Sequence, residues 1–318
     1  MNSIKRIIKS NRILTGLYRF GYRCMATIFW NLSFFLDKIL HKNAIYANCF
    51  VFTTPFGRVK KNNWGDDLND HLFTAFSRQK IHFVPFDQLF FAPKVKRYSL
   101  IGSIIGDYCL DHTIIYGSGA IDEIPKLVGR PTKVLSVRGP LSRNALIENG
   151  IECPEVYGDP ALLLPLIYSP KVTKKNKIGI IPHYRTDDMT FVSFMKKNYD
   201  VSIIDMSQYD KWTDIVDRIR ECSVIISESL HGLIVAEAYG IPSVWVEITP
   251  HEYPWEWGVK FRDFYESIGK KNEVCIRIYE GSGPEDILKK AEEWKAGQID
   301  YDSMLKAFPF DIKRKLKR

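Results

Sequence analysis

The chain alternates short apolar runs with stretches whose apolar residues recur at helical spacing, in two successive series. The first series predicts strands at residues 45–53, 99–105, 113–116 and 133–138, with helices near 68–73 and at 141–148. The second predicts strands at residues 178–182, 201–204, 224–226 and 244–246, with helices at 190–198, 212–220 and 230–239. Strands that alternate with helices in this way predict parallel sheets, so we expect an α/β protein with two doubly wound domains.

A polar, basic, proline-containing stretch at residues 169–177 separates the two series and is typical of an interdomain linker. We therefore expect an N-terminal α/β domain at residues 43–168 and a C-terminal one at 177–280. A basic amphipathic segment, 1–42, precedes them, and a C-terminal helix with a basic tail, 281–318, follows. The amphipathic part of that last segment is expected to cross back onto the first domain.

Residues 222–247 form the most informative segment, because they compress a strand, a turn, a helix, a turn and a second strand into about the minimum length. His231 falls just after the first of these strands. Ligands in open α/β sheets lie at the carboxyl ends of the strands, where a following helix offers free N–H groups and the positive end of its dipole. The sequence thus places a titratable imidazole at a site suited to anions, although a histidine there can also simply pack at a helix start.

Glycine stands beside a polar residue at the end or start of several predicted elements. Five turns share this feature, at residues 63–67, 117–119, 138–140, 158–160 and 230–232. Glycine there lets a backbone approach a ligand closely, and successive N–H groups form a nest for an anion. Spread over two α/β units, these turns predict a cleft between the domains.

The net charge of +8 is unevenly distributed along the chain. Residues 1–42 carry eight Lys or Arg against one acid, giving +7, and the last six residues add +5, which leaves −4 for the remainder. A mildly acidic body argues against a nucleic-acid-binding groove, which needs a basic stripe. Basic ends flanking the apolar residues 24–36, too short to span a bilayer, predict an interfacial helix on an anionic membrane surface. A helix packed on the body is the alternative.

Cysteine and histidine are scattered without metal-ligand spacing. None of the six cysteines forms a C-x-x-C pair, and neither they nor the seven histidines suggest a structural metal. Widely separated cysteines in a chain of 318 residues are typical of reduced thiols. We expect a cytoplasmic protein, peripheral at the inner face of the plasma membrane, with no metal and no cofactor.

Several motifs together resemble the polysaccharide pyruvyl transferase family over roughly residues 60–270. They are N-x-G-D-D-L from Asn63, G-S-G at 117–119, V-R-G-P-L-S at 137–142, Y-G-D-P-A-L-L-L-P at 157–165, S-L-H-G-L-I-V-A-x-A-x-G-I-P at 229–242 and K-x-x-D-F-x-x-S at 260–267. The resemblance implies two Rossmann-like domains facing a cleft, as in GT-B glycosyltransferases. It also implies transfer of pyruvate from phosphoenolpyruvate, as co-substrate, to a sugar of a cell-surface glycan, with a lipid-linked acceptor favoured by the basic ends.

One position departs from the family pattern. Ser229 stands where many members carry an Arg implicated in holding the donor. The donor's charge then rests on other cations, of which Arg138, Arg185 and Lys260 are the candidates.

Ketal formation from phosphoenolpyruvate requires a proton donor, and His231 suits this role, with Glu228 as a group that favours the imidazolium. We assign catalysis to His231, Asp66 and Asp159. The expected donor-binding residues are Arg138, Gly117, Ser118, Gly119, Ser229, Gly232, His183, Arg185 and Lys260. The expected acceptor-binding residues are Asn63, Asp67, Trp255 and Trp257.

Structural roles for several of these residues remain open at this point. Asp66 or Asp67 is equally suited to cap the following helix, and Asp159 either orients His231 or caps its own turn. Arg138 is also suited to a salt bridge across its domain, and the Trp255 and Trp257 rings to lid or core packing.

Two other functions compete with pyruvyl transfer. A GT-B glycosyltransferase with a nucleotide-sugar donor would need a carboxylate for the ribose, for which Glu247 is the candidate. A non-catalytic assembly protein on a decayed enzyme scaffold is the other reading, motivated by Ser229.

Overall fold

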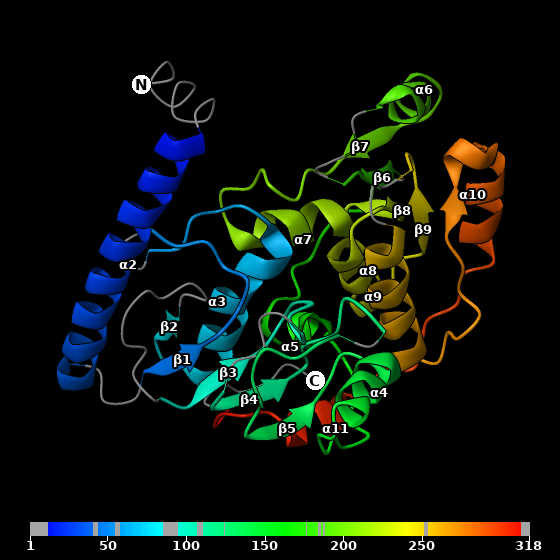
Figure 1. Ribbon diagram of the computed structural model, residues 1–318. Coiled ribbons are helices and arrows are strands. Elements are labelled where there is room, and N and C mark those ends of the chain that lie inside the picture. The colour runs from blue at the N-terminus through cyan, green and yellow to red at the C-terminus, as the bar shows by residue number, and fades with distance from the viewer. Residues whose placement is uncertain are drawn as a thin grey trace.

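The computed structural model describes residues 12–40, 44–54, 58–84, 95–106, 111–123, 125–175, 177–183, 186, 188–250 and 254–312. They form two five-stranded sheets whose paired strands all run parallel. We call the part of the chain around the first sheet the first half, and the part around the second sheet the second half (Figure 1). The predicted α/β class with two Rossmann-like units is confirmed, whereas the exact domain boundaries stay a prediction.

The first sheet has the strand order β2-β1-β3-β4-β5. Its strands are β1 (Ile45–Ala47), β2 (Ile81–Phe83), β3 (Arg97–Ser99), β4 (Thr113–Tyr116) and β5 (Lys133–Ser136). Its helical elements are α3 (Trp64–Ser77), α4 (Pro140–Glu148), η1 (Pro160–Leu163) and α5 (Leu164–Ile167). Ile114, Ile115 and Tyr116 of β4, an interior strand of this sheet, are all buried, as expected for a strand covered on both faces.

The second sheet has the strand order β10-β9-β8-β6-β7. Its strands are β6 (Lys177–Ile181), β7 (Val201–Ile203), β8 (Cys222–Ser227), β9 (Ser243–Glu247) and β10 (Ile276–Arg277). Its helical elements are α6 (Thr190–Asn198), α7 (Trp212–Arg220), α8 (Leu230–Ala238), α9 (Pro254–Ser267), η2 (Ile278–Glu280) and α10 (Pro284–Glu292). The compact strand–helix–strand unit predicted at residues 222–247 is therefore β8-α8-β9.

Helix α8 joins the two halves, because its side chains are buried on all sides. Leu233, Ile234, Val235 and Ala236 have no exposed surface, which fits a helix that is apolar all round. They belong to one hydrophobic cluster that also contains α3 and η1 residues of the first half. The core is thus continuous across the two sheets.

Two strands predicted in the first half were wrong in extent. The run at 99–105 leaves the sheet at Ser99, because Asn69 accepts a hydrogen bond from the Ile101 N–H and donates one to its carbonyl. Gly102 then turns the chain at φ +132°. The run at 45–53 leaves the sheet after Ala47, and Thr53 pairs antiparallel with Val59 instead.

The C-terminal part of the chain crosses back to the first half, but not through the helix that the sequence suggested. Helix α10 packs on the second sheet through Ile287 and Ala291. The return is made by α11 (Tyr301–Lys306) and the residues after it: the Tyr116 hydroxyl donates to the Met304 carbonyl, and Phe308 stacks on Phe73. The basic tail at 313–318 lies outside the described residues.

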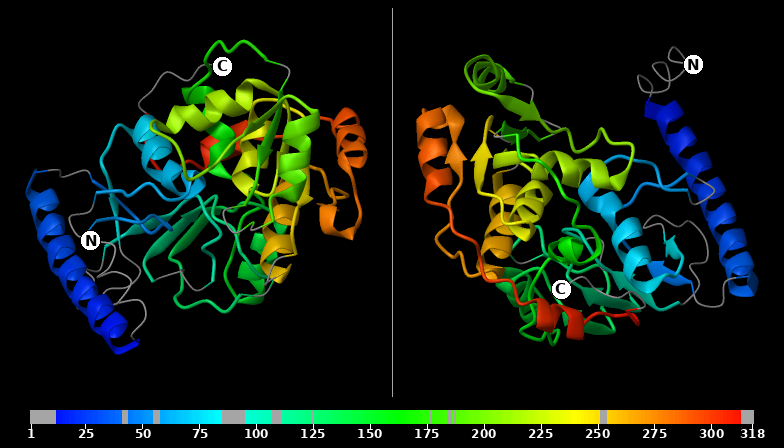
Figure 2. Two further views of the ribbon diagram at one scale, coloured as in Figure 1. Left: turned by 90° about the horizontal axis from the view of Figure 1, so that it is seen from above. Right: turned by 180° about the vertical axis from the view of Figure 1, so that it is seen from behind.

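The N-terminal helix α2 (Arg12–Leu40) stands at the edge of the molecule beside the first sheet (Figures 1 and 2). Trp30 and Phe34 are buried against Val84, and the Trp30 indole N–H donates to the Phe83 carbonyl at 3.0 Å. Within the described residues, no helix combines the length and the apolar character needed to cross a bilayer.

Candidate active site

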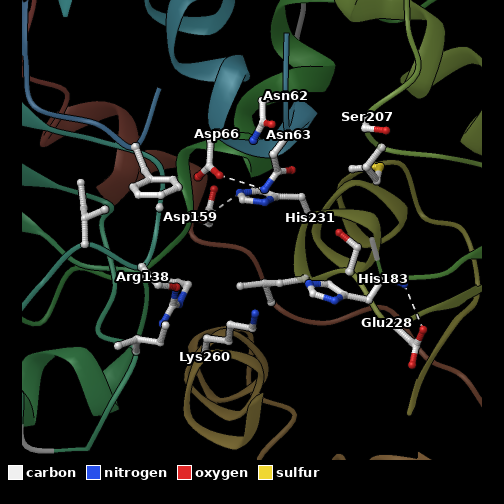
Figure 3. Close-up of a pocket in the computed structure, with 18 of the residues that line it drawn as sticks. Asn62, Asn63, Asp66, Arg138, Asp159, His183, Ser207, Glu228, His231 and Lys260 are labelled. Carbon is white, nitrogen blue, oxygen red and sulfur yellow. Dashed lines mark hydrogen bonds and ion pairs between the residues drawn. The ribbon is translucent and has the colours of Figure 1, made fainter. Parts of the chain in front are cut away.

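A cavity of about 350 Å³ opens between the carboxyl ends of the two sheets. Its walls come from both halves (Figure 3). The lining residues that carry polar side chains are Asn62, Asn63, Asp66, Ser103, Arg138, Asp159, His183, Asp205, Ser207, Glu228, Ser229, His231 and Lys260. This is the cleft that the glycine-containing turns predicted.

His231 lies in the first turn of α8 at the centre of the cavity (Figure 3). Its ring lies directly against the backbone of α3, since a Cβ atom at Gly65 would lie only 2.0 Å from the His231 Nδ1. Glycine in the Asn63–Asp67 motif is therefore required by the imidazole that packs on it. The first N–H groups of α8 lack intrahelical partners and offer an anion site beside the ring.

The second ring nitrogen of His231 is buried, and the described residues give it no hydrogen-bond partner. The closest carboxylate contact runs from His231 Nε2 to Asp159 Oδ2, at 4.0 Å. Burial lowers the pKa of His231 to about 3, and the positive charges of Arg138 and Lys260 add to this shift. At this pKa the ring is neutral near pH 7.

Two carboxyl groups of the first half flank the imidazole, and both hold protons more tightly than usual. Burial raises the pKa of Asp66 to about 7, with a further rise from the charge of Asp67. Burial raises the pKa of Asp159 to about 6, against the hydrogen bond from the Ala161 N–H. Asp159 uses Oδ1 for that bond, at 2.9 Å, and so caps η1 while its other oxygen faces His231.

Arg138 is buried and forms an ion pair between the two halves. Its Nε donates to Asp263 Oδ2 of α9 at 3.0 Å, Nη1 donates to the Ser103 hydroxyl, and Nη2 donates to the Ala120 carbonyl. Three of its five N–H groups are thus used inside the protein. The guanidinium lines the cavity and contributes a positive charge to it. Bidentate hydrogen bonding of Arg138 to a donor stays a prediction.

Among the described residues Lys260 is a second cation at the cavity, and it projects from α9 toward His231 (Figure 3). Its charge lowers the pKa of His231 and opposes the rise in the pKa of Asp66, so it acts on both groups. Two cations, two carboxyls with raised pKa values and a neutral imidazole make a site that can hold an anion and move a proton beside it.

Glu228 does not pair with His231. Its carboxylate accepts hydrogen bonds from the His183 N–H at 2.9 Å, the Thr186 hydroxyl and the Ile248 N–H at 2.7 Å. It therefore ties together the segments that follow β6 and β9, and it fixes the backbone at His183, whose ring lines the cavity. These bonds do not test whether the Glu228 charge favours the imidazolium, and that expectation stays a prediction.

The Gly117–Gly119 turn does not line the cavity but packs against residues that do or that lie next to them. A Cβ at Gly119 would lie 2.1 Å from the Arg138 guanidinium carbon, and one at Gly117 would lie 2.3 Å from Pro160 Cδ. Ser118 is buried and donates to the Leu100 carbonyl. Gly232 likewise packs on Ser227 and Ile181. These glycines make room for side chains of the site.

The predicted acceptor residues are divided between the cavity and its surroundings. Asn63 caps α3, which begins at Trp64 and not near Leu68, and its amide donates to Asp66 at 2.8 Å. Asp67 lies away from the cavity and accepts a hydrogen bond from the Tyr209 hydroxyl at 2.7 Å.

Three other predicted site residues have side chains outside the described part of the chain. They are Arg185, Trp255 and Trp257. Their roles stay predictions.

Several lining residues escaped the sequence analysis. Asp205 and Ser207 follow β7, so the strand-end rule was a signal for them. Ser103 and Phe50 lie in irregular segments that had been predicted as strands, and no local pattern marks them. Glu247, the ribose candidate, is bound to Arg277 and the Tyr279 hydroxyl and does not line the cavity.

Comparisons with known proteins connect this geometry to a family. The family model described as polysaccharide pyruvyl transferase matches residues 19–250. An uncharacterized protein of Acanthamoeba polyphaga mimivirus is 26% identical over 246 residues, which cover 72% of this chain and 76% of that protein. A crystal structure of an uncharacterized protein from Klebsiella pneumoniae covers 77% of this chain and 98% of its own, at 15% identity and a TM-score of 0.40.

Proposed function

Since the chain belongs to the polysaccharide pyruvyl transferase family, a family of enzymes, we propose that it transfers pyruvate from phosphoenolpyruvate to a sugar of a cell-surface glycan. The product is a pyruvyl ketal that bridges two hydroxyls, and His231 is the general acid. The observation that carries this assignment is the buried His231 Nε2, which has no partner among the described residues and lies between carboxyls and cations in the cavity.

The reaction begins with a proton transfer from the imidazolium to the methylene carbon of the donor. This turns the adjacent carbon into an oxocarbenium-like centre, which a first sugar hydroxyl attacks. The C–O bond to phosphate then breaks, and the second hydroxyl closes the ring. Of the two hydroxyl protons, one restores the acid and the other leaves with inorganic phosphate, so the atoms balance.

Donor binding supplies the charge that His231 needs. Burial disfavours an imidazolium at His231, and the charges of Arg138 and Lys260 add to that penalty. A donor with phosphate and carboxylate groups offsets both positive charges, which raises the pKa of His231 when the donor is bound. Asp66 and Asp159, with pKa values of about 7 and 6, are the nearby groups suited to exchange protons with the ring or with a sugar hydroxyl.

The first N–H groups of α8 lack intrahelical partners, and we place the donor's phosphate or carboxylate beside them. Ser229 caps this helix without a side-chain hydrogen bond to it and lines the cavity where the expected Arg is missing. Lys260, which lines the cavity from α9, then supplies positive charge for the donor beside Arg138, whose guanidinium pairs with Asp263.

The test is acceptor-dependent release of inorganic phosphate from phosphoenolpyruvate, with the ketal product identified by mass spectrometry. We expect His231→Gln to slow phosphate release by roughly 10²- to 10⁴-fold, the usual contribution of a positioned general acid. His71→Gln, at a half-buried histidine outside the cavity, is the matched control. Wild-type rates in His231→Gln would contradict the assignment, and release of a nucleotide from a nucleotide sugar would favour a glycosyltransferase.

A further inference from the structure

Helix α2 carries an apolar stripe that faces away from the protein. The stripe consists of Leu14, Leu17, Tyr18, Met25, Ile28, Leu32, Phe35, Leu36 and Ile39. At 3.6 residues per turn these positions fall within an arc of roughly 100°, so they share one side of the helix. Their exposed fractions run from 41% at Leu14 to 72% at Ile39. A contiguous apolar surface of this kind marks an interaction site.

The opposite side of α2 fixes the direction in which the stripe points. Thr27, Trp30 and Phe34 are buried on the first half, and the Trp30 N–H donates to the Phe83 carbonyl. The Trp30 ring also contacts His82 edge-on at 5.6 Å between centroids. The helix is therefore already anchored by one side, and its other side is left for a partner.

The dimensions of the stripe suit a surface better than a bilayer crossing. A helix of 29 residues is about 44 Å long at 1.5 Å per residue. One side of it is occupied by the protein along Thr27, Trp30 and Phe34, so only the stripe is available to lipid. A helix with one apolar side lies in the membrane interface with that side among the acyl chains.

Charge decides between a membrane and a second copy of this chain. Residues 1–42 carry +7, with Asp37 as the only acid. Two copies joined along the stripe would bring two such segments together, and the positive charges of the two segments would repel each other. An anionic lipid surface would instead attract and partly neutralise the same charge.

We propose that α2 docks the protein on an anionic membrane surface, with the stripe among the lipid acyl chains and the net positive charge of residues 1–42 attracted to the anionic headgroups. This docking does not depend on the transfer reaction.

A contact between α2 and the loop that contains Phe50 adds a consequence, which rests on the proposed function. The Tyr22 hydroxyl donates to the Thr53 carbonyl at 3.0 Å, and the same loop supplies Phe50 to the cavity wall. Docking through α2 therefore holds one wall of the cavity near the membrane, where a lipid-linked acceptor would lie.

The test is co-flotation of the full chain with phosphatidylcholine vesicles, with and without phosphatidylglycerol. We expect binding to the anionic vesicles that weakens as salt is added. The double variant Leu32→Ser, Phe35→Ser should bind roughly tenfold less tightly or worse, because two apolar side chains leave the interface. Both are more than half exposed, at 54% and 62%, so the fold should be kept; a second pair, Ile28→Ser with Ile39→Ser, repeats the test.

The matched control replaces apolar residues of similar exposure outside α2. Val128→Ser with Val274→Ser, at 64% and 61% exposed, should bind like the wild type. Equal binding by the stripe variants, or no binding by the wild type, would overturn the proposal. A wild-type dimer in sedimentation equilibrium that the stripe variants dissociate would assign the stripe to a second copy. Phosphate release with a soluble acceptor is measured separately, so its failure would count only against the proposed reaction.

Discussion

At the residue scale, burial is the main cause of the pKa shifts of the titratable groups in the site. His231 is held neutral by burial and by two cations, whereas Asp66 and Asp159 are held protonated to higher pH by burial. The groups are therefore poised in opposite directions within one cavity. Opposed pKa shifts of this kind are a mark of acid–base sites.

The titration of Asp66 should be visible in the pH dependence of stability. Its pKa is raised from 3.8 to about 7 in the folded protein, so between these values the folded chain binds more protons than the unfolded chain. The free energy of unfolding then falls as pH rises through this window. Asp66→Asn cannot titrate and keeps the bond from Asn63, so its stability relative to wild type should grow from pH 4 to pH 7, by about 2–4 kcal/mol. Urea unfolding at several pH values measures this, and a difference that stays constant with pH would contradict it.

Gly65 sets the position of His231. An alanine there would place a Cβ 2.0 Å from the ring, so Gly65→Ala should displace His231 and slow phosphate release by roughly 10²-fold. Gly283→Ala is the control, because a Cβ at that position meets nothing within 4 Å. If Gly65→Ala released phosphate at the rate of the control, the added methyl group would not displace the His231 ring, and the prediction would be contradicted.

At the element scale, helix α9 joins the second half to the first through Asp263. The carboxylate of Asp263 is fully buried and accepts hydrogen bonds from Arg138, from the Ser142 N–H and from the Ser142 hydroxyl. Gly139 allows this approach, because a Cβ there would lie 1.9 Å from the Asp263 carbonyl oxygen. The Arg-Gly-Pro-Leu-Ser motif is thus explained by the helix that docks on it.

Asp263→Asn should therefore be strongly destabilising. The substitution leaves a buried guanidinium without its counter-charge, which costs about 3–5 kcal/mol of the free energy of unfolding. Glu123→Gln is the matched control: it breaks the ion pair with Arg262 on the same helix, but that pair is exposed and worth about 0–1 kcal/mol. Urea denaturation compares the two, and equal losses would mean that Arg138 finds another partner.

The sequence predicted elements well where one period dominates and poorly where tertiary contacts decide. Helices α6 and α7 begin and end at the predicted residues, and the β8-α8-β9 unit was found from its apolar runs and stops. Strand β2 was missed, because three residues with a central His82 carry little pattern. The wrong extent of the predicted strand at 99–105 follows from Asn69, a residue 32 positions away from Ile101.

Site residues divide in the same way. His231, Asp66 and Asp159 were found because motifs mark the carboxyl ends of strands, and the structure brings all three to one cavity. The contacts that fix other residues of the cavity were not predictable. The partner of Arg138 is Asp263, 125 positions away, and Glu228 is held by donors from two other segments. Local sequence marks the candidate site residues, whereas the contacts that hold the site together come from distant parts of the chain.

At the scale of the whole molecule, the two sheets share one hydrophobic core. Phe73 of α3 in the first half, and Ile219 and Leu233 of the second, belong to the same buried cluster. Residues after α10 extend this union, because Met304 and Phe308 pack on the first half. Neither sheet can lose its packing without exposing apolar surface of the other.

The protein should therefore unfold in a single cooperative transition. Differential scanning calorimetry is expected to give one peak whose calorimetric enthalpy equals the van't Hoff enthalpy. Two resolved transitions, or a stable isolated fragment of residues 43–168, would show that the halves are independent.

The return of the chain at Met304 also orders its folding in time. The Tyr116 hydroxyl donates to a carbonyl 188 positions later in the chain. Phe73 and Phe76 remain exposed to solvent until Phe308 packs on them. On a ribosome, where domains otherwise mature from the N-terminal side, the first half emerges early yet lacks this cover. Its apolar surface stays open to aggregation and to proteases until the second half has also been synthesised, so the last elements made complete the packing of the first.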